Sequence, residues 1–329
     1  MIDFRYHLVS IIAVFLALAV GLAVGSTALS GKAEEALTAA QHRALAENNA
    51  LHKEKNLLQS ELAVAEALEA ASAKAILAGQ LPQDRVVLIA APNADTAVLS
   101  GLTTALRQAG ATVTGEVQLT TQFTTTSGQT EDELSQLAGS LAAQSGLALA
   151  TDPANEAVAG QQAAAQVLAD SLVSSSGTET SSSSQNILND FSQAGYITVS
   201  GTPAAQPAQL AVLVTPNGPP PQSASQVLAA VAQELKAAGG STVMAGAVIS
   251  IGAGSAISVE DSAGPMVSTV DNADTETGQI MVVLALRLAL EGKSPQAYGA
   301  GPGTAVSPAP TAAATPTSRP STSPTVKSH

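Results

Sequence analysis

Two loops in the sequence share the four residues Asn-Ala-Asp-Thr, at positions 93–96 and 272–275. Each loop follows an apolar, β-branched run and precedes a helical stretch, so we expect both at the carboxyl end of a strand. Open α/β sheets bind their ligands at that edge. The simpler interpretation is N-capping, because Asp, Asn and Thr satisfy the free N–H groups at the start of a helix.

The second loop has an additional carboxylate, because Asp271 directly precedes Asn272. Asp271, Asn272 and Asp274 together suit a cation or the basic group of a partner protein, and their negative charge disfavours a phosphate. Thr275 completes the polar set. The sequence therefore leaves two hypotheses for this loop: a partner-binding site and a helix cap.

No pattern of metal ligands can be recognised. The chain has no cysteine, which excludes disulfides, thiolate catalysis and Cys-ligated metal sites. His42 and His52 are not spaced as an i, i+4 pair, and His7 and His329 lie near the two ends. The methionines are not clustered as a Cu(I) site requires. We therefore identify no cofactor and leave any metal site unknown.

Catalytic machinery is not visible either. No histidine falls in the stretch that we expect to be globular, so no Ser-His-Asp set can form there. Residues 252–254, Gly-Ala-Gly, lack the third glycine and the following helix of a dinucleotide-binding loop. The net charge of −13, without a basic cluster, excludes nucleic acid as a partner. The sequence predicts no enzyme.

The strongest signal in the chain lies near its start. Residues 8–29 carry no charge and nothing more polar than Ser or Thr. As a helix they span about 33 Å, enough to cross the bilayer core. A cleaved signal peptide is the alternative, but this run exceeds the usual apolar region of such peptides. We predict an uncleaved transmembrane helix.

The charges around this helix predict its orientation. Arg5 and the amino terminus lie on one side, whereas Lys32 on the other side is balanced by Glu34 and Glu35. By the positive-inside tendency, residues 1–7 form a cytoplasmic flank and the bulk of the chain is extracytoplasmic. The sequence therefore predicts a single-pass membrane protein of the cell envelope.

A long helix without proline or glycine is predicted for residues 32–78. Leu51 and Leu58 repeat every seven residues, and Leu62 occupies the matching second row of a heptad seam. This spacing predicts a parallel two-stranded coiled coil, and hence a homodimer. Asn48, in the same row as Leu62, lowers stability but fixes the register. The alternative is a single solvated helix packed on its own domain.

Strands and helices alternate over residues 84–293. Apolar, β-branched runs predict strands, and helices of about a dozen residues between them are typical of a parallel sheet. Such strand–helix–strand units are predicted at residues 85–119 and 209–247. We therefore predict an extracytoplasmic α/β domain with a mainly parallel sheet. Residues 294–329, rich in Pro, Ala, Ser and Thr, are predicted to be a disordered tail.

Three motifs indicate a family. They are Ile-Asp-Phe-Arg-Tyr-His-Leu-Val-Ser at residues 2–10, Phe-Leu-Ala-Leu-Ala-Val-Gly at 15–21, and Val-Asp-Asn-Ala-Asp-Thr at 270–275, which Gly278 and Gln279 follow. On these motifs, residues 1–299 resemble the MctB-like family of actinobacterial copper transporters, the family of mycobacterial copper transport protein B. The resemblance implies copper efflux or copper homeostasis in the cell envelope. It also implies a link to septation through a second envelope protein. It implies no copper-binding residue here.

The transport role and the scaffold role require different structures. A transport pore needs several spans or a closed barrel, and this chain offers one span, so a pore requires oligomers or another subunit. A non-enzymatic envelope or septation scaffold needs an anchor, a dimerising stalk and an outer domain, which the sequence supplies. We keep copper efflux as the main expectation and the scaffold as the alternative.

Overall fold

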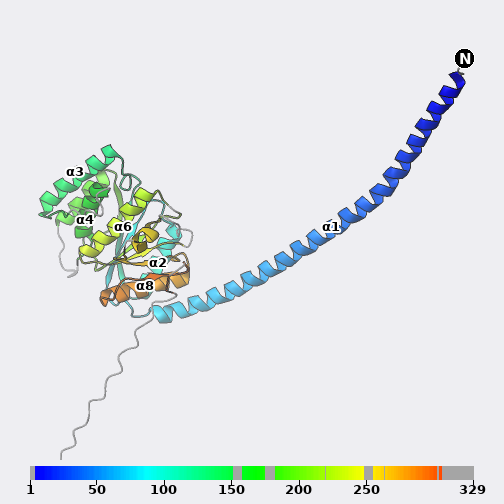
Figure 1. Ribbon diagram of the computed structural model, residues 1–329. Helices are drawn as coiled ribbons and strands as arrows, with labels where there is room; N and C mark the ends of the chain where they lie inside the picture. The colour runs from blue at the N-terminus through cyan, green and yellow to red at the C-terminus, as the bar shows by residue number, and fades with distance from the viewer. Residues whose placement is uncertain are drawn as a thin grey trace, which may run out of the picture. The chain divides into compact units, whose positions relative to one another are not determined.

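The computed structural model describes residues 4–150, 158–174, 182–218, 220–247, 255–262, 264–301 and 304–305. The chain divides into two compact units, Met1–Ala67 and Leu68–His329 (Figure 1). The glycine motif at residues 252–254 and most of the predicted tail, residues 306–329, lie outside the described residues.

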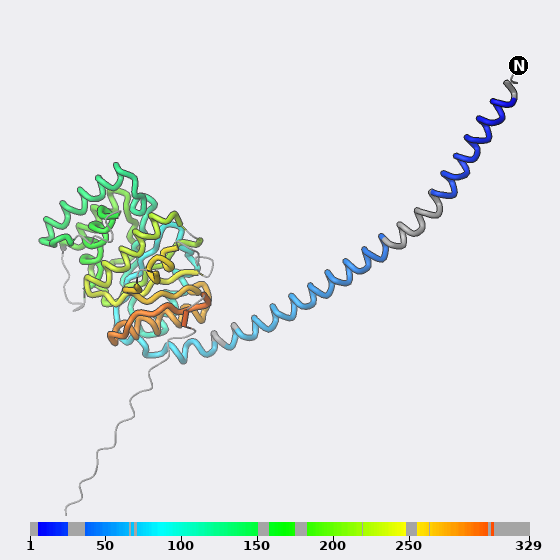
Figure 2. The backbone as a smooth tube through the Cα atoms, viewed as in Figure 1, coloured from blue at the N-terminus to red at the C-terminus, as the bar shows by residue number. Residues whose placement is uncertain are grey.

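Helix α1, Phe4–Leu77, is one continuous element of 74 residues (Figure 2). It joins the two helices that the sequence predicts on either side of Gly31. A single glycine costs only about 1 kcal/mol in a helix, and strong helix formers surround this one. Tyr6–Gly25 within α1 has a mean hydropathy of 2.7 and is long and apolar enough to cross a membrane. The predicted N-terminal apolar helix is therefore confirmed by length and composition.

The leucines of the predicted heptad seam are exposed on α1. The exposed fractions of Leu51, Leu58 and Leu62 are 65%, 57% and 58%. Their exposure leaves these side chains available to a second helix, and the two-stranded coiled coil stays a prediction.

The second unit contains a seven-stranded sheet in the order β3-β2-β1-β4-β5-β6-β7. Strand β3 is antiparallel to β2, and every other neighbouring pair is parallel. This confirms the predicted α/β domain with a mainly parallel sheet. The strands are β1 (Arg85–Ala90), β2 (Thr112–Leu119), β3 (Ile197–Gly201), β4 (Leu210–Val214), β5 (Ser241–Ala245), β6 (Ser268–Val270) and β7 (Ala297–Tyr298).

Helices cover both faces of this sheet (Figure 1). Alternate residues of β1 point to opposite faces, so Val87 and Ile89 join one core whereas Val86 and Leu88 join the other. Helices α2 and α8 and the end of α1 pack on the Val86 face, and the remaining helices on the Val87 face. The helices after α1 are α2 (Thr96–Gln108), α3 (Gly128–Ser145), α4 (Ala159–Leu172), α5 (Ser182–Gln193), α6 (Gln222–Ala237), α7 (Ala256–Ser262) and α8 (Glu276–Leu290).

The direction of the crossovers reverses between β1 and β4. From β1 the chain crosses through α2 to β2 on one side, whereas β4, on the other side of β1, continues through α6 to β5. In open α/β sheets such a reversal leaves a crevice beyond the carboxyl ends of the two strands, and ligands bind there.

The domain extends further than the sequence predicts. Residues 294–301 belong to the predicted tail, yet β7 pairs with β6 and Tyr298 is only 3% exposed. The predicted boundary at residue 293 is therefore wrong. A strand of two residues has no sequence pattern of its own and is stabilised by tertiary contacts. Its Gly- and Pro-rich surroundings are typical of a tail, so the sequence does not reveal it.

Candidate functional site

Asp271, the first residue after β6, is engaged within the domain. Its side chain is 2% exposed, and its two carboxylate oxygens accept hydrogen bonds from the N–H groups of Ala300 at 2.7 Å and Gly301 at 2.8 Å. Gly299 lies so close that a Cβ there would overlap Oδ1 of Asp271, and its φ of 136° also favours glycine. Through these two hydrogen bonds, Asp271 holds the turn after β7 against the end of β6.

Thr275 caps helix α8. Its Oγ1 accepts a hydrogen bond from the N–H of Gly278 at 3.0 Å and donates one to the carbonyl of Asn272 at 2.8 Å. In the first loop, Asp95 accepts a hydrogen bond from the N–H of Ala97 at 2.8 Å and caps α2. The capping interpretation is thus confirmed for one residue in each loop. Asp274 is exposed and therefore accessible to a partner protein. Its partner-binding role stays a prediction.

Both loops lie at the carboxyl edge of the sheet, as expected, but they do not meet. The first follows β1 and the second follows β6, and β4 and β5 lie between these strands. The helices that the loops begin, α2 and α8, pack against each other, and a Cβ on Gly101 would overlap the Gln279 side chain. The shared motif therefore positions two neighbouring helices.

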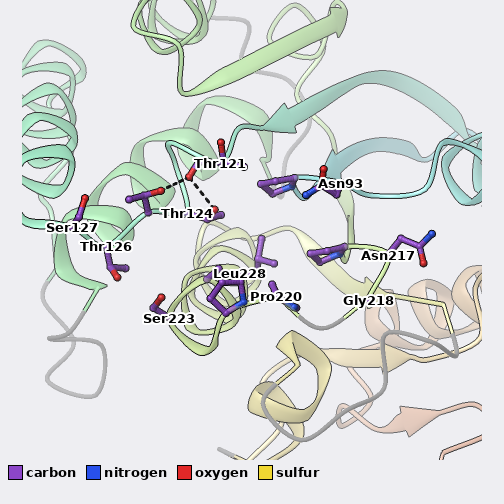
Figure 3. Close-up of a pocket in the computed structure, with 15 residues that line it drawn as sticks. Asn93, Thr121, Thr124, Thr126, Ser127, Asn217, Gly218, Pro220, Ser223 and Leu228 are labelled. Carbon is purple, nitrogen blue, oxygen red and sulfur yellow. Dashed lines mark hydrogen bonds between the residues drawn. The ribbon is translucent and has the colours of Figure 1, made fainter.

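A pocket of about 720 Å³ lies at the reversal between β1 and β4 (Figure 3). Four segments form it: the loops after β1, β2 and β4, and the first turns of α6. We call it the switch-point pocket. Its lining residues are Pro92, Asn93, Thr121, Thr124, Thr125, Thr126, Ser127, Pro216, Asn217, Gly218, Pro220, Pro221, Ser223, Ala224 and Leu228.

The lining of this pocket is neutral. It combines hydroxyl and amide side chains with proline rings, and among the residues that the structure describes it contains no ionisable and no aromatic residue. Thr124 and Thr125 donate hydrogen bonds to the carbonyl of Thr121, at 3.2 and 2.7 Å, and so fix the loop after β2 (Figure 3). Thr126 and Ser223, drawn on the same side of the pocket, add further hydroxyls from the loop after β2 and from α6.

Backbone contacts hold the loops after β1 and β4 together. The N–H of Asn217 donates to the carbonyl of Asn93 at 3.0 Å, and Ala94 and Pro216 form an isolated bridge. Asn93 adopts a φ of 60°, in the left-handed region that asparagine tolerates better than most residues. The side of the pocket formed by the loops after β1 and β4 is therefore held in place by backbone contacts.

Three buried polar atoms close in sequence or by contact to lining residues have no hydrogen-bond partner: Gln161 Oε1, Thr215 Oγ1 and Ser225 Oγ. Thr215 and Ser225 are each one residue from the lining, and Gln161 donates through Nε2 to the carbonyl of Thr125 at 2.8 Å. Buried polar atoms are normally paired with protein or water, but these three are covered by the protein and are not among the lining residues of the pocket.

This pocket is not apparent from the sequence. Its lining comes from loops that are far apart in the chain, and no charged or histidine residue draws attention to them. One signal is present in the sequence: Pro-Asn occurs one residue after two buried strands, at residues 92–93 and 216–217.

Acidic side chains also gather beside β6. Burial raises the pKa of Asp261 above its usual value; a hydrogen bond from Thr269 lowers that pKa, and the charges of Glu260 and Asp271 raise it. The Thr269 hydroxyl lies 2.9 Å from Oδ1 of Asp261. Among the described residues, no group of three or more His, Cys, Asp or Glu side chains is placed to hold a metal ion.

Comparison with known proteins gives the family. The family described as "Copper transport outer membrane protein, MctB" matches residues 1–308. Copper transporter MctB of Mycobacterium tuberculosis and of Mycobacterium bovis are each 28% identical to this chain over 312 residues, which cover 92% of this chain and 98% of theirs. The matches include the apolar start, helix α1 and the α/β domain. The chain therefore belongs to the MctB family.

Proposed function

We propose that this protein is anchored in a membrane of the cell envelope and supports copper efflux, with its α/β domain on the extracytoplasmic side. One observation carries the proposal: the family match covers the candidate span Tyr6–Gly25 and the α/β domain together. The copper role comes from the mycobacterial relatives, which are named copper transporters. The orientation rests on Arg5 and the positive-inside tendency.

The single span limits how copper can move. Tyr6–Gly25 is the one candidate span in the part of the chain that the structure describes. One helix encloses no path for an ion. In our proposal copper therefore passes through an assembly of several copies, or through a second protein that this chain organises, and no catalytic step is involved.

Cellular copper content tests this proposal. In cells that lack the protein, we expect copper to accumulate when external copper is raised, and the full chain should restore the normal content. Leu16→Arg with Val20→Arg should abolish the rescue, because each arginine costs about 2.5–3.5 kcal/mol at the centre of a membrane helix. Leu16→Ile with Val20→Leu is the matched control. Normal copper content in the deletion strain would contradict the proposal.

The scaffold is the second candidate function, and the exposed seam of α1 favours it. Leu51, Leu58 and Leu62 leave an apolar row that a second copy would cover. A homodimer built in this way would present two α/β domains to another envelope or septation protein. Asp274 and Thr275, both exposed, lie at an edge where such a partner would bind.

Copper titration of the purified protein separates the two functions. The chain has no cysteine, and thiolates are the ligands that best retain Cu(I). We expect Cu(I) to bind no more tightly than to an ordinary protein surface. A stoichiometric site that withstands a strong chelator would favour direct handling of copper, whereas a specific envelope partner captured without such a site would favour the scaffold.

A further inference from the structure

We infer that the switch-point pocket binds a neutral saccharide unit. The inference is independent of copper, because it rests on the pocket alone. At about 720 Å³ the pocket lies in the range of sites that hold small molecules, and it occupies the position where open α/β sheets bind ligands.

The lining selects against charged ligands. Among the described lining residues, an anion would meet no lysine or arginine and a cation would meet no carboxylate. A charged ligand would lose its hydration there without gaining an ion pair, which is unfavourable. The net charge of −13 adds repulsion for anions. The ligand is therefore uncharged.

The polar groups of the pocket match those of a sugar. Threonine and serine hydroxyls each donate and accept, and the asparagine amides do both through separate atoms. Sugar hydroxyls need this mixture, because each of them also donates and accepts. The proline rings and Leu228 supply apolar contacts for the C–H faces of a sugar ring.

An uncharged peptide is the nearest competitor, and the sheet disfavours it. Extended peptides bind by adding a strand to a free sheet edge. Strands β1 and β4 are interior strands, paired on both sides. The carbonyl of Asn93 already accepts the N–H of Asn217. A ligand in this pocket is therefore held by side chains, which suits a compact molecule.

Ligand-observed NMR and calorimetry on the full chain test the inference. The protein is kept in a zwitterionic detergent without a sugar head group. The neutral probes are N-acetylglucosamine, its β-1,4-linked dimer and trehalose. The comparison probes are glucuronate, glucosamine and an uncharged blocked Ala-Pro-Ala peptide. We expect at least one neutral sugar to bind with a Kd on the order of 1 mM or tighter.

Paired variants locate the binding. Thr126→Val with Ser223→Ala removes two pocket hydroxyls and should weaken sugar binding about 5- to 20-fold, the effect of losing one or two hydrogen bonds. Thr104→Val with Ser100→Ala removes two exposed hydroxyls from α2 and should leave binding unchanged. If the first pair disturbs folding, Asn93→Gly removes an amide from the lining while tolerating the left-handed backbone there.

Three results would overturn the inference. The first is that no neutral sugar binds. The second is that glucuronate, glucosamine or the peptide binds better than every neutral sugar. The third is that sugar binding resists the pocket variants, including Asn93→Gly, since the ligand would then lie elsewhere.

Discussion

Asp271→Asn should open the edge of the sheet at β7. The wild-type carboxylate is buried and accepts the N–H groups of Ala300 and Gly301 at 2.7 and 2.8 Å. Asparagine keeps one acceptor oxygen and turns an NH₂ group towards the other N–H. A hydrogen bond to a charged group contributes about 1.5–3 kcal/mol, and an unpaired buried donor adds to its loss. We expect a total of about 2–4 kcal/mol.

Hydrogen exchange measures this loss where it occurs. Because β7 is a short edge strand, its opening precedes global unfolding. A loss of 2–4 kcal/mol corresponds to about 30- to 700-fold faster exchange at the amides of Ala300 and Gly301. Asp170→Asn is the control, since Asp170 is exposed on α4 and this change should alter exchange and melting little. Unchanged protection at Ala300 and Gly301 in the Asp271 variant would refute the reasoning.

Three further predictions follow from glycine packing, burial and the heptad seam. Gly278→Ala should destabilise the domain by about 2–4 kcal/mol, because its Cβ would overlap a backbone carbonyl, whereas Gly139→Ala in the open part of α3 should stabilise it by about 0.5–1 kcal/mol; urea unfolding compares them. Burial raises the pKa of Asp261 in the folded state, so its ionisation lowers stability as pH rises through that pKa. Asp261→Asn should therefore melt higher than wild type at pH 7, and the difference should vanish below about pH 4; a constant difference across this range would contradict the assignment. Because the chain has no cysteine, Leu58→Cys should form a disulfide-linked dimer on mild oxidation in membranes, whereas Lys53→Cys on the opposite side of the seam should not; equal cross-linking would contradict the coiled coil.

The sequence predicted the parts of the fold whose patterns are local. The runs at residues 85–90 and 209–214 indicate strands because both faces of β1 and β4 are buried, so apolar residues are continuous. Asp95 and Thr275 indicate helix starts because a cap acts within three residues. Such signals need no knowledge of the rest of the chain.

What the sequence did not predict depends on contacts between distant residues. Strand β7 is held by Asp271, nearly thirty residues earlier, so its own residues resemble a tail. The switch-point pocket gathers loops after β1, β2 and β4, and its hydroxyl and amide residues are ordinary loop residues when read singly. The partner role of Asp271 and Asp274 was a hypothesis from charge, and the structure adds that the charge of Asp271 is engaged within the domain.

The sheet edge at β7 also affects how copies of the protein behave when crowded. An exposed edge strand offers unpaired backbone groups to a neighbouring chain and invites aggregation. Here the N–H of Gly299 donates to the carbonyl of Ala305, and the N–H of Ala305 donates to the carbonyl of Ala297. The outer side of β7 is therefore already paired by its own chain. The β7 edge is therefore not open to a strand from another copy, so encounters between copies do not extend the sheet on this side.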